Sequence, residues 1–489
     1  MPASSEEFAR VAPEVCAMIQ AWIAHGEDAT TPAIPESTPQ ALRKRIDAAW
    51  PMQGMDDAAL LGTMQLLLEN SINPWTERFM AKLYSAPSIA SVCGEMLLAA
   101  MNASVHVYSA SPALSTVEDA CAAQLAALFD FAENADGITM PGGAASNTLA
   151  VQTALCAAFD GTYRRDGVYG LVEYLHRNGR QGRGARPALL TSAASHFSLD
   201  RAALAAGLGM DAVVHVPVDA HDRMRVDALA AILDAMTRDP SHPNGAPFFV
   251  NATSGTTVLG AFDDIEAIAH VCAKYHCWLH VDASWGGAAV FSPAQRSALL
   301  RGSGMADSIT INPHKLLCVT HQCSFLLVRD ARVLREHAIH AGYLFHERGP
   351  VVDHAMKTLG CGRRGEALKL YLTWCRHGTA GLAAHIDAGL AVARHVLAQI
   401  QACPLLELGP LAEPLFLQIC FRPVQYGSAT GSAATHKLHA ALQAERQFAV
   451  DFAPTAQGDF MRLVVHPRTP QHIFSALLER ILALLRSDM

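Results

Sequence analysis

Short apolar runs alternate with amphipathic helical patterns between about residues 100 and 370. The clearest runs are rich in β-branched and aromatic residues and occupy 213–218, 248–253, 278–284, 309–312 and 325–329. Between two of these runs, residues 263–276 carry apolar side chains at the spacing of one helix face. Strand, helix and strand in this order predict an α/β fold with a mostly parallel sheet and helices on both faces.

The pattern predicts three parts. Residues 1–95 read as helices with too little apolar periodicity to fold alone, so we expect an N-terminal helical arm that packs on a partner subunit. Residues 96–370 are predicted to form the large domain. Residues 371–489 begin with a long Ala- and Leu-rich helix and are predicted to form a small C-terminal α/β domain, with strands at 415–421 and 461–466 and a helix at 470–485.

Charge and cysteine use limit the function classes. The net charge of −8 over 489 residues gives no reason to expect nucleic acid or an anionic membrane as a partner. No apolar run reaches the roughly 18 residues of a membrane span, and the N-terminus lacks the basic segment and apolar core of a secretory signal. The 12 cysteines are scattered without a CxxC pair, which favours reduced thiols in a cytoplasmic protein.

A lysine closes one of the apolar runs. Residues 308–315 (SITINPHK) end on Lys315, and two leucines follow it. A lone lysine is usually a solvated surface charge, but this setting is apolar. Partial desolvation lowers a lysine pKa and favours the neutral amine that a Schiff base requires. We therefore interpret Lys315 as a candidate for covalent attachment of pyridoxal phosphate.

A carboxylate closes the preceding run. Residues 278–282 (WLHVD) end on Asp282, which small residues follow. An aspartate here caps a turn in many proteins. Its functional reading is specific, because a carboxylate against the pyridine nitrogen of pyridoxal phosphate keeps that nitrogen protonated and lets the ring accept electrons.

The phosphate of such a cofactor needs an anion site. Residues 141–147 (PGGAASN) form a glycine-rich turn that runs into a helical pattern at 148–159. Backbone N–H groups at a helix N-terminus, with the Ser146 hydroxyl, suit a phosphate dianion, and the spacing differs from that of a nucleotide-binding loop. His196 is either a core histidine or an imidazole that stacks on the cofactor ring. His346-Glu347 fails the HExxH pattern, so we expect no catalytic metal.

In this order, the motifs resemble the group II pyridoxal-phosphate-dependent amino acid decarboxylases, and most closely the glutamate and cysteine sulfinate decarboxylase branch. The resemblance extends from about Asn70 to the C-terminus. The matching segments are 141–147 (PGGAASN), 195–198 (SHFS), 252–263 (ATSGTTVLGAFD), 278–287 (WLHVDASWGG), 312–317 (NPHKLL), 322–324 (QCS), 341–345 (AGYLF) and 361–363 (CGR).

The resemblance implies a type I PLP-dependent transferase fold, with a mostly parallel seven-stranded sheet in the large domain and active sites shared across a homodimer. It implies Lys315, Asp282 and His196 as catalytic residues. It also implies a cofactor-binding set, which is Ala145, Ser146, His196, Thr253, Asp282, Ser284, Asn312, His314 and Lys315. Arg462, in 460–465 (FMRLVV), matches the arginine that grips the substrate carboxylate. Ser104 and His106 lie in the segment that shapes side-chain specificity.

The expected reaction is decarboxylation of a small acidic L-amino acid: cysteine sulfinate, aspartate or glutamate. Two departures from the family are notable. Ser284 stands where relatives usually have alanine, and residues 346–360 lack the tyrosine that reprotonates Cα in many relatives. His354 and His196 remain as candidate proton donors. Two alternatives stay open: a decarboxylating aldehyde synthase, and a non-catalytic homologue that kept the fold.

Overall fold

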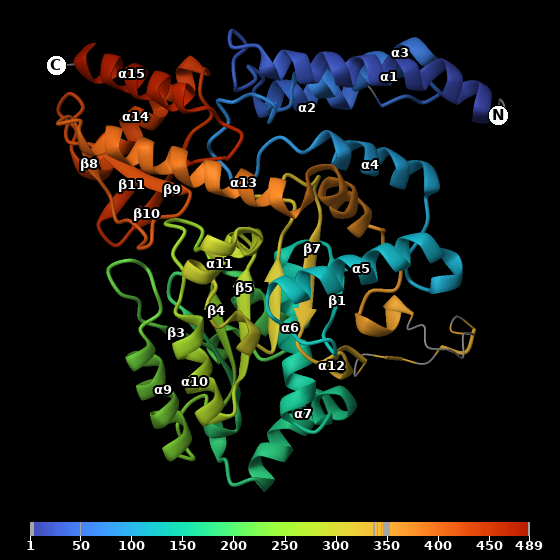
Figure 1. Cartoon of the computed structure of the whole chain (residues 1–489), viewed down its shortest axis with the longest axis vertical. Coiled ribbons are helices and arrows are strands. Elements are labelled where there is room, and N and C mark those ends of the chain that lie inside the picture. The colour runs from blue at the N-terminus through green and yellow to red at the C-terminus, as the bar shows by residue number, and fades with distance from the viewer. Residues whose placement is uncertain are drawn as a thin grey trace. The chain divides into compact units, whose positions relative to one another are not determined.

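The computed structural model describes residues 4–48, 50–335, 338–339, 341–343, 345 and 353–487. The chain forms two compact units (Figure 1). We call the first, Pro87–Ala391 with Pro410–Gln418, the sheet unit. The second, Met1–Ala86 with Val392–Gly409 and Ile419–Met489, is the terminal unit. The predicted boundaries at 95/96 and 370/371 stay predictions, and helix α13 (Ala367–Gln401) runs through the second of them.

A seven-stranded sheet forms the centre of the sheet unit. Its strand order is β1-β7-β6-β5-β4-β2-β3, and β7 runs antiparallel to both of its neighbours while β6, β5, β4, β2 and β3 are parallel. The strands are β1 (Asp136–Met140), β2 (Pro187–Ser192), β3 (Val213–Val216), β4 (Ala246–Thr253), β5 (Trp278–Ala283), β6 (Ser308–Ile311) and β7 (Ser324–Val328). The predicted α/β fold with a mostly parallel sheet is confirmed.

The apolar runs form strands because they can be buried on both faces. Every residue of β2, β6 and β7 is buried, which is typical of a sheet covered by helices on each side. Figure 1 shows α9 and α10 on one side of the strands and α6 and α7 on the other. The helices that follow α4 (Ile89–Met101) here are α5 (Pro112–Leu128), α6 (Gly143–Ala158), α7 (Thr162–Arg177), α8 (Ser198–Ala205), α9 (Val226–Arg238), α10 (Ile265–Tyr275), α11 (Pro293–Leu299) and α12 (Arg332–Arg335).

Helix α10 shows how the apolar periodicity of the sequence corresponds to a buried helix face. Asp264 caps it by accepting a hydrogen bond from the backbone N–H of Ala267. Its buried face consists of the predicted apolar positions, Ile265, Ile268, Ala269 and Cys272. The helix lies between β4 and β5 in the chain and packs on both strands, so it returns the chain to the edge where the preceding strand began.

A short strap, residues 410–418, rejoins the sheet unit from late in the sequence. The Gln418 side chain accepts a hydrogen bond from Trp285 Nε1–H at 3.0 Å and donates one to the Thr256 carbonyl at 3.1 Å. Phe416 packs edge-on against the rings of Phe262 and Trp285. The strap therefore fixes the loops that follow β4 and β5.

The terminal unit combines the two ends of the chain around a four-stranded sheet of order β10-β11-β9-β8. Ala449 N–H donates to the Arg78 carbonyl, and Ala33 N–H donates to the Arg446 carbonyl. Its elements are α1 (Ser4–Glu27), α2 (Pro39–Ala48), α3 (Asp57–Glu69), β8 (Leu406–Leu408), β9 (Gln418–Pro423), α14 (Gly431–Glu445), β10 (Asp451–Thr455), β11 (Gly458–Val464) and α15 (Gln471–Ser487).

All 12 cysteines are free thiols. In the described part of the chain, no helix combines the length and the apolar character that crossing a bilayer requires. Within the same residues, no group of His, Cys, Asp or Glu side chains is placed to hold a metal ion.

Candidate active site

A cavity of about 210 Å³ opens at the carboxyl edge of β4, β5 and β6 in the sheet unit. Ligand sites in parallel sheets form at this edge, because the loops that leave neighbouring strands meet there. The lining residues are Gly143, Ala144, Asn147, His196, Ser198, Thr253, Gly255, Thr257, Asp282, Ser284, Trp285, Asn312, His314 and Lys315. The cavity thus brings together seven of the nine predicted cofactor-binding residues.

Lys315 is partly buried in the turn after β6, where its backbone N–H donates to the Asn312 carbonyl at 3.0 Å. Burial lowers the pKa of its amine, and the charge of Asp282 offsets part of that effect. Among the described residues, the Lys315 amine forms no hydrogen bond or ion pair. A neutral, unpaired amine is the form that attacks an aldehyde.

Asp282 lies at the end of β5, opposite Thr253 of β4 and Thr310 of β6. Its Oδ2 accepts a hydrogen bond from Asn147 Nδ2 at 2.8 Å, and its Oδ1 accepts one from the backbone N–H of Ser284 at 3.1 Å. Burial alone would raise the pKa of this carboxyl, but the Ser284 hydrogen bond, the His280 and Lys315 side chains and the Asn147 hydrogen bond lower it. Asp282 is therefore an ionised carboxylate in a buried setting.

His196 presents a neutral ring to the same cavity. Its Nδ1 accepts a hydrogen bond from the backbone N–H of Ser198 at 3.2 Å, so the neutral imidazole carries its proton on Nε2. Burial and the charge of Lys315 lower the pKa of His196. A neutral, flat ring is suited to stack on another aromatic ring. Thr253 is held by its backbone N–H, which donates to Asp263 Oδ2 at 2.7 Å.

The other end of the cavity is the N-terminus of α6. Gly142, with φ of 100°, makes the turn into the helix, whose first residues, Gly143 and Ala144, line the cavity. A Cβ at Gly143 would lie 2.6 Å from Ser284 Oγ and 2.8 Å from Asn312 Nδ2, so only glycine allows this close approach. Asn312 Oδ1 is buried without a hydrogen-bond partner. An amine, a buried carboxylate, a flat imidazole and a helix N-terminus in one cavity fit pyridoxal 5′-phosphate.

The structure separates Ala145 and Ser146 from this cavity. The Ser146 side chain is fully buried and its hydroxyl lies 2.7 Å from Ser324 Oγ. Ala145 lines a second cavity of about 700 Å³ on the other side of α6, together with Gln152 and Gln322. Their contact with the phosphate stays a prediction. Among the lining residues that the sequence-based prediction did not assign is Asn147, one position after Ser146, which contacts Asp282.

Arg462 belongs to the terminal unit, in β11. Its guanidinium donates to the Ala81 carbonyl at 2.8 Å and is largely buried. Its role toward a substrate carboxylate stays a prediction. The missing-tyrosine segment falls partly on residues 346–352, which lie outside the described residues.

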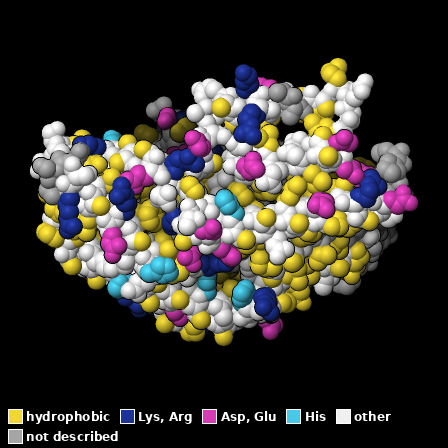
Figure 2. All heavy atoms as spheres, turned by 90° about the horizontal axis from the view of Figure 1, so that it is seen from above, with side chains coloured by type: hydrophobic (Ala, Val, Ile, Leu, Met, Phe, Trp, Pro, Cys, Tyr) yellow, Lys and Arg dark blue, Asp and Glu magenta, His cyan; other side chains and the backbone are white. Residues whose placement is uncertain are grey.

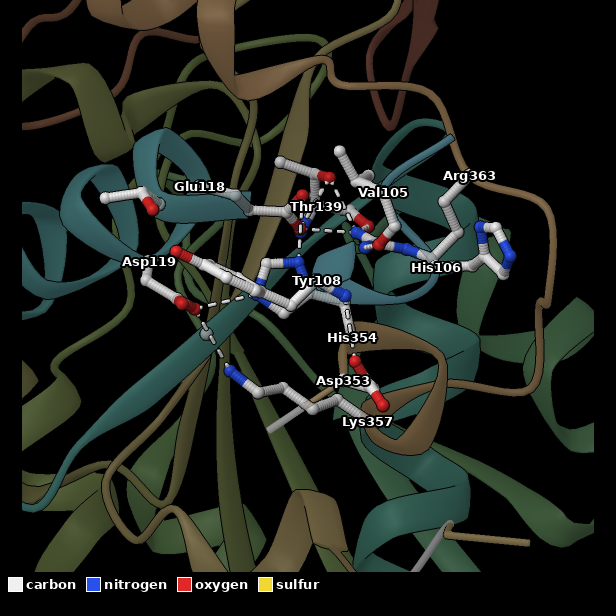
Figure 3. A network of polar contacts seen from close by, with 12 residues as sticks. Val105, His106, Tyr108, Glu118, Asp119, Thr139, Asp353, His354, Lys357 and Arg363 are labelled. Carbon is white, nitrogen blue, oxygen red and sulfur yellow. Dashed lines mark hydrogen bonds and ion pairs between the residues drawn. The ribbon is translucent and has the colours of Figure 1, made fainter. Parts of the chain in front are cut away.

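Figure 3 shows His106 and His354 in a network of polar contacts, and Ser104 is bonded to the same network. Ser104 Oγ accepts a hydrogen bond from Arg363 N–H at 3.1 Å and lies 2.9 Å from His106 Nδ1. The backbone of this segment is tied to residues 353–363, because Val105 N–H donates to the Arg363 carbonyl and Ala355 N–H donates to the His106 carbonyl. None of these residues lines the Lys315 cavity.

A buried ion network anchors that contact. Glu118 of α5 has no exposed surface, pairs with the Arg363 guanidinium, and accepts hydrogen bonds from Thr139 N–H and Oγ1–H at 2.8 Å each. His354 is 2% exposed, and its Nε2 lies 2.8 Å from Asp119 Oδ1. Burial alone would lower the pKa of His354, but Asp119 and Glu118 raise it. Of the two candidate proton donors, His196 is the one that lines the cavity.

Glu118→Gln is expected to destabilise the fold by about 3–5 kcal/mol, because it leaves the buried Arg363 guanidinium without its counter-charge. Chemical denaturation of the purified holoenzyme measures the loss. Glu173→Gln is the matched control, since Glu173 forms an exposed i,i+4 pair with Arg177 that contributes about 0.3–0.5 kcal/mol. Equal stability of the two variants would contradict the buried pair.

Comparison with known proteins gives a consistent family. The sequence model described as "Pyridoxal-dependent decarboxylase conserved domain" matches residues 39–424. An L-aspartate decarboxylase of Metarhizium robertsii is 37% identical over 473 residues, covering 94% of this chain and 90% of the relative. A human cysteine sulfinic acid decarboxylase is 35% identical over 392 residues, covering 78% and 74%. The crystal structure of mouse CSAD in apo form superposes with a TM-score of 0.89 at 28% identity and 99% coverage of both chains.

Proposed function

Since this chain belongs to the pyridoxal-dependent decarboxylase family, we propose that it removes the carboxylate from Cα of a small acidic L-amino acid, with the amine and carbon dioxide as products. The chain is a PLP-dependent carboxy-lyase. Cysteine sulfinate, aspartate and glutamate are the proposed substrates. The meeting of Lys315 and Asp282 in one cavity is the observation that carries the reaction type. The substrate class is supported by the similarity to an aspartate and a cysteine sulfinic acid decarboxylase.

The proposed mechanism assigns a task to each side chain. Pyridoxal phosphate, when bound, supplies an aldehyde carbon that links to amines and a ring that accepts the electrons of a broken Cα bond. Lys315 would hold the cofactor through its amine, whose pKa burial lowers. Asp282 would keep a proton on the ring nitrogen, and His196 would support the ring face. Arg462 is proposed to bind the substrate carboxylate with its two-pronged guanidinium.

We also propose a cytoplasmic homodimer with shared active sites. One face of α4 carries exposed apolar side chains spaced along one stripe: Ile89 (54% exposed), Met96 (46%), Leu97 (51%) and Met101 (49%). On the face viewed in Figure 2, hydrophobic side chains cover much of the surface and charges of both signs are interspersed. Such a surface suits a protein partner better than nucleic acid or an anionic membrane. Twelve free thiols suit a reducing compartment.

The test is a screen of carbon dioxide release by the holoenzyme over cysteine sulfinate, aspartate, glutamate, cysteate and the aromatic amino acids. The expected result is clear preference for one acidic substrate with stoichiometric amine. Preference for an aromatic substrate would contradict the proposal. Peroxide and aldehyde in place of the amine would identify the decarboxylating aldehyde synthase, and no turnover of any amino acid would identify a non-catalytic homologue.

A further inference from the structure

A continuous chain of buried hydrogen bonds leads to Asp282 from behind the cavity. Trp278 Nε1–H donates to Ser308 Oγ at 2.8 Å, and Ser308 Oγ lies 2.8 Å from His280 Nδ1. His280 Nε2 lies 3.1 Å from Asn147 Oδ1, and Asn147 Nδ2 lies 2.8 Å from Asp282 Oδ2. The chain links β5, β6 and α6. Apart from Trp278, all of its members are at most 4% exposed, and His280 has no exposed surface.

The chemistry of the groups fixes the direction of every bond. The ionised Asp282 carboxylate only accepts, so it faces the amide nitrogen of Asn147; a reversed amide would place two oxygens against each other. The second N–H of that amide donates to Ser198 Oγ at 2.9 Å. Asn147 Oδ1 is thus an acceptor, and the hydrogen in that bond must come from His280 Nε2.

On the other side of the His280 ring, the bond directions follow from its protonation state. His280 is neutral, because burial lowers its pKa to about 4. Its Nδ1 therefore accepts a hydrogen bond from the Ser308 hydroxyl, whose oxygen accepts the one from Trp278. Each donor along this chain points toward Asp282, and hydrogen bonds aligned in one direction polarise one another.

We propose that His280 is a positioning residue that acts through Asn147: as the Nε2–H tautomer it orients the amide that holds the Asp282 carboxylate ionised and facing the cofactor nitrogen. A cationic His280 would break this arrangement in two ways. Both of its nitrogens would donate, so the Ser308 hydroxyl would lose its acceptor. A buried positive charge behind Asp282 would also cancel much of the negative potential that the carboxylate exerts at the ring nitrogen.

Two substitutions separate this role from simple packing. His280→Leu removes both nitrogens, whereas His280→Gln keeps an amide donor near the position of Nε2. The main readout is the protonation state of the ring nitrogen, measured by solid-state NMR on holoenzyme loaded with ¹⁵N-labelled pyridoxal phosphate. We expect partial loss of the proton in His280→Leu and retention in His280→Gln. In kinetics, we expect kcat to fall about 10- to 100-fold in His280→Leu with a small change in KM, by analogy with groups that orient ligands to metal sites.

Phe249→Leu is the packing control. Phe249 stacks on His280 with ring centroids 5.6 Å apart but takes no part in the hydrogen-bond chain. We expect it to lower stability and to leave the ring-nitrogen signal unchanged. A wild-type ring-nitrogen signal in His280→Leu would overturn the proposal, and so would a folded His280→Gln that behaves like His280→Leu.

A measurement on the unsubstituted enzyme covers the case in which His280→Leu does not fold. ¹⁵N-histidine labelling, with His280→Gln used to assign the signal, reports the tautomer of His280 directly. The expected state is neutral with the proton on Nε2 at pH 7, and a cationic ring or an Nδ1–H tautomer would refute the proposal. The proposal rests on the proposed role of Asp282 and not on the substrate, so the substrate screen can fail without affecting either NMR measurement.

Discussion

Lys315→Ala is expected to abolish covalent attachment of the cofactor and to lower carbon dioxide release on the order of 10⁴-fold or more, as for removal of a nucleophile. The reason is that burial lowers the pKa of the amine, which is unpaired among the described residues and placed at the edge of the cavity that Asp282 also lines. The loss appears as a missing visible absorbance of the holoenzyme. It also appears after borohydride reduction, when no peptide that spans residue 315 carries a vitamin B6 derivative.

Lys274→Ala is the control for this prediction. Lys274 is an exposed lysine near the end of α10, and its loss should leave absorbance, labelling and activity unchanged. A Lys315→Ala protein that retained the borohydride-fixed cofactor on another lysine would contradict the assignment. A fold destroyed by the substitution would be visible in circular dichroism and would be distinguished from loss of the reactive amine.

Asp282→Asn should lower kcat on the order of 10²- to 10³-fold while the cofactor remains attached to Lys315. An amide has nearly the same size but no negative charge, so nothing would hold the proton on the ring nitrogen as electrons arrive. Two acceptor oxygens would also become one, which leaves either Asn147 or the Ser284 amide without its partner. Steady-state kinetics together with the holoenzyme spectrum measure both parts of the expectation.

Asp264→Asn is the control, because it makes the same Asp-to-Asn change away from the cavity. Asp264 caps α10 from the surface, and asparagine caps a helix about as well as aspartate. We expect unchanged kinetics from this variant. If Asp282→Asn kept wild-type kcat, the carboxylate would have no part in the electron-accepting step.

Much of the large sheet could be predicted from sequence, and so could the shared location of Asp282 and Lys315. Both residues follow apolar runs that are easily recognised as strands. The run at 278–284 is observed as β5 (Trp278–Ala283), and the run at 309–312 is observed as β6 (Ser308–Ile311). Each run is apolar, ends abruptly and delivers an ionisable side chain to the same edge of the sheet. Strands β1 and β2 were absent from the predicted set, since β1 begins Asp-Gly and β2 begins with proline, which weakens their strand pattern.

The motif at 141–147 shows the limit of predicting a binding residue from local sequence alone. Ser146 and Asn147 are consecutive residues of α6, and neighbouring positions on a helix point in directions about 100° apart. The sequence favoured the Ser146 hydroxyl, yet Asn147 lines the cavity while Ser146 bonds Ser324 on β7. Asn147 also lies 135 residues from the aspartate that it contacts. Only the packing of α6 on the sheet determines which of the two faces the cofactor site.

The structural role of the CGR segment is visible only from its tertiary contacts and not from its sequence. Arg363 was part of a family-like motif without an assigned task, and in the structure it pairs with Glu118 and contacts the Ser104 segment. Likewise, residues 1–86 share a compact unit with the C-terminal residues. No composition shift along the chain reveals that its two ends fold together.

The strap at 410–418 has a consequence for how this chain can be divided. The indole that it steadies, Trp285, belongs to the wall of the cofactor cavity, yet the strap is encoded after the long helix α13 has already entered the terminal unit. The sheet unit, which contains the cavity, cannot be produced as one continuous segment of the chain. Gene fusions, circular permutants or split versions of this enzyme must therefore include residues 410–418 together with the earlier sequence. Otherwise they must replace the contacts of Gln418 and Phe416 by other means.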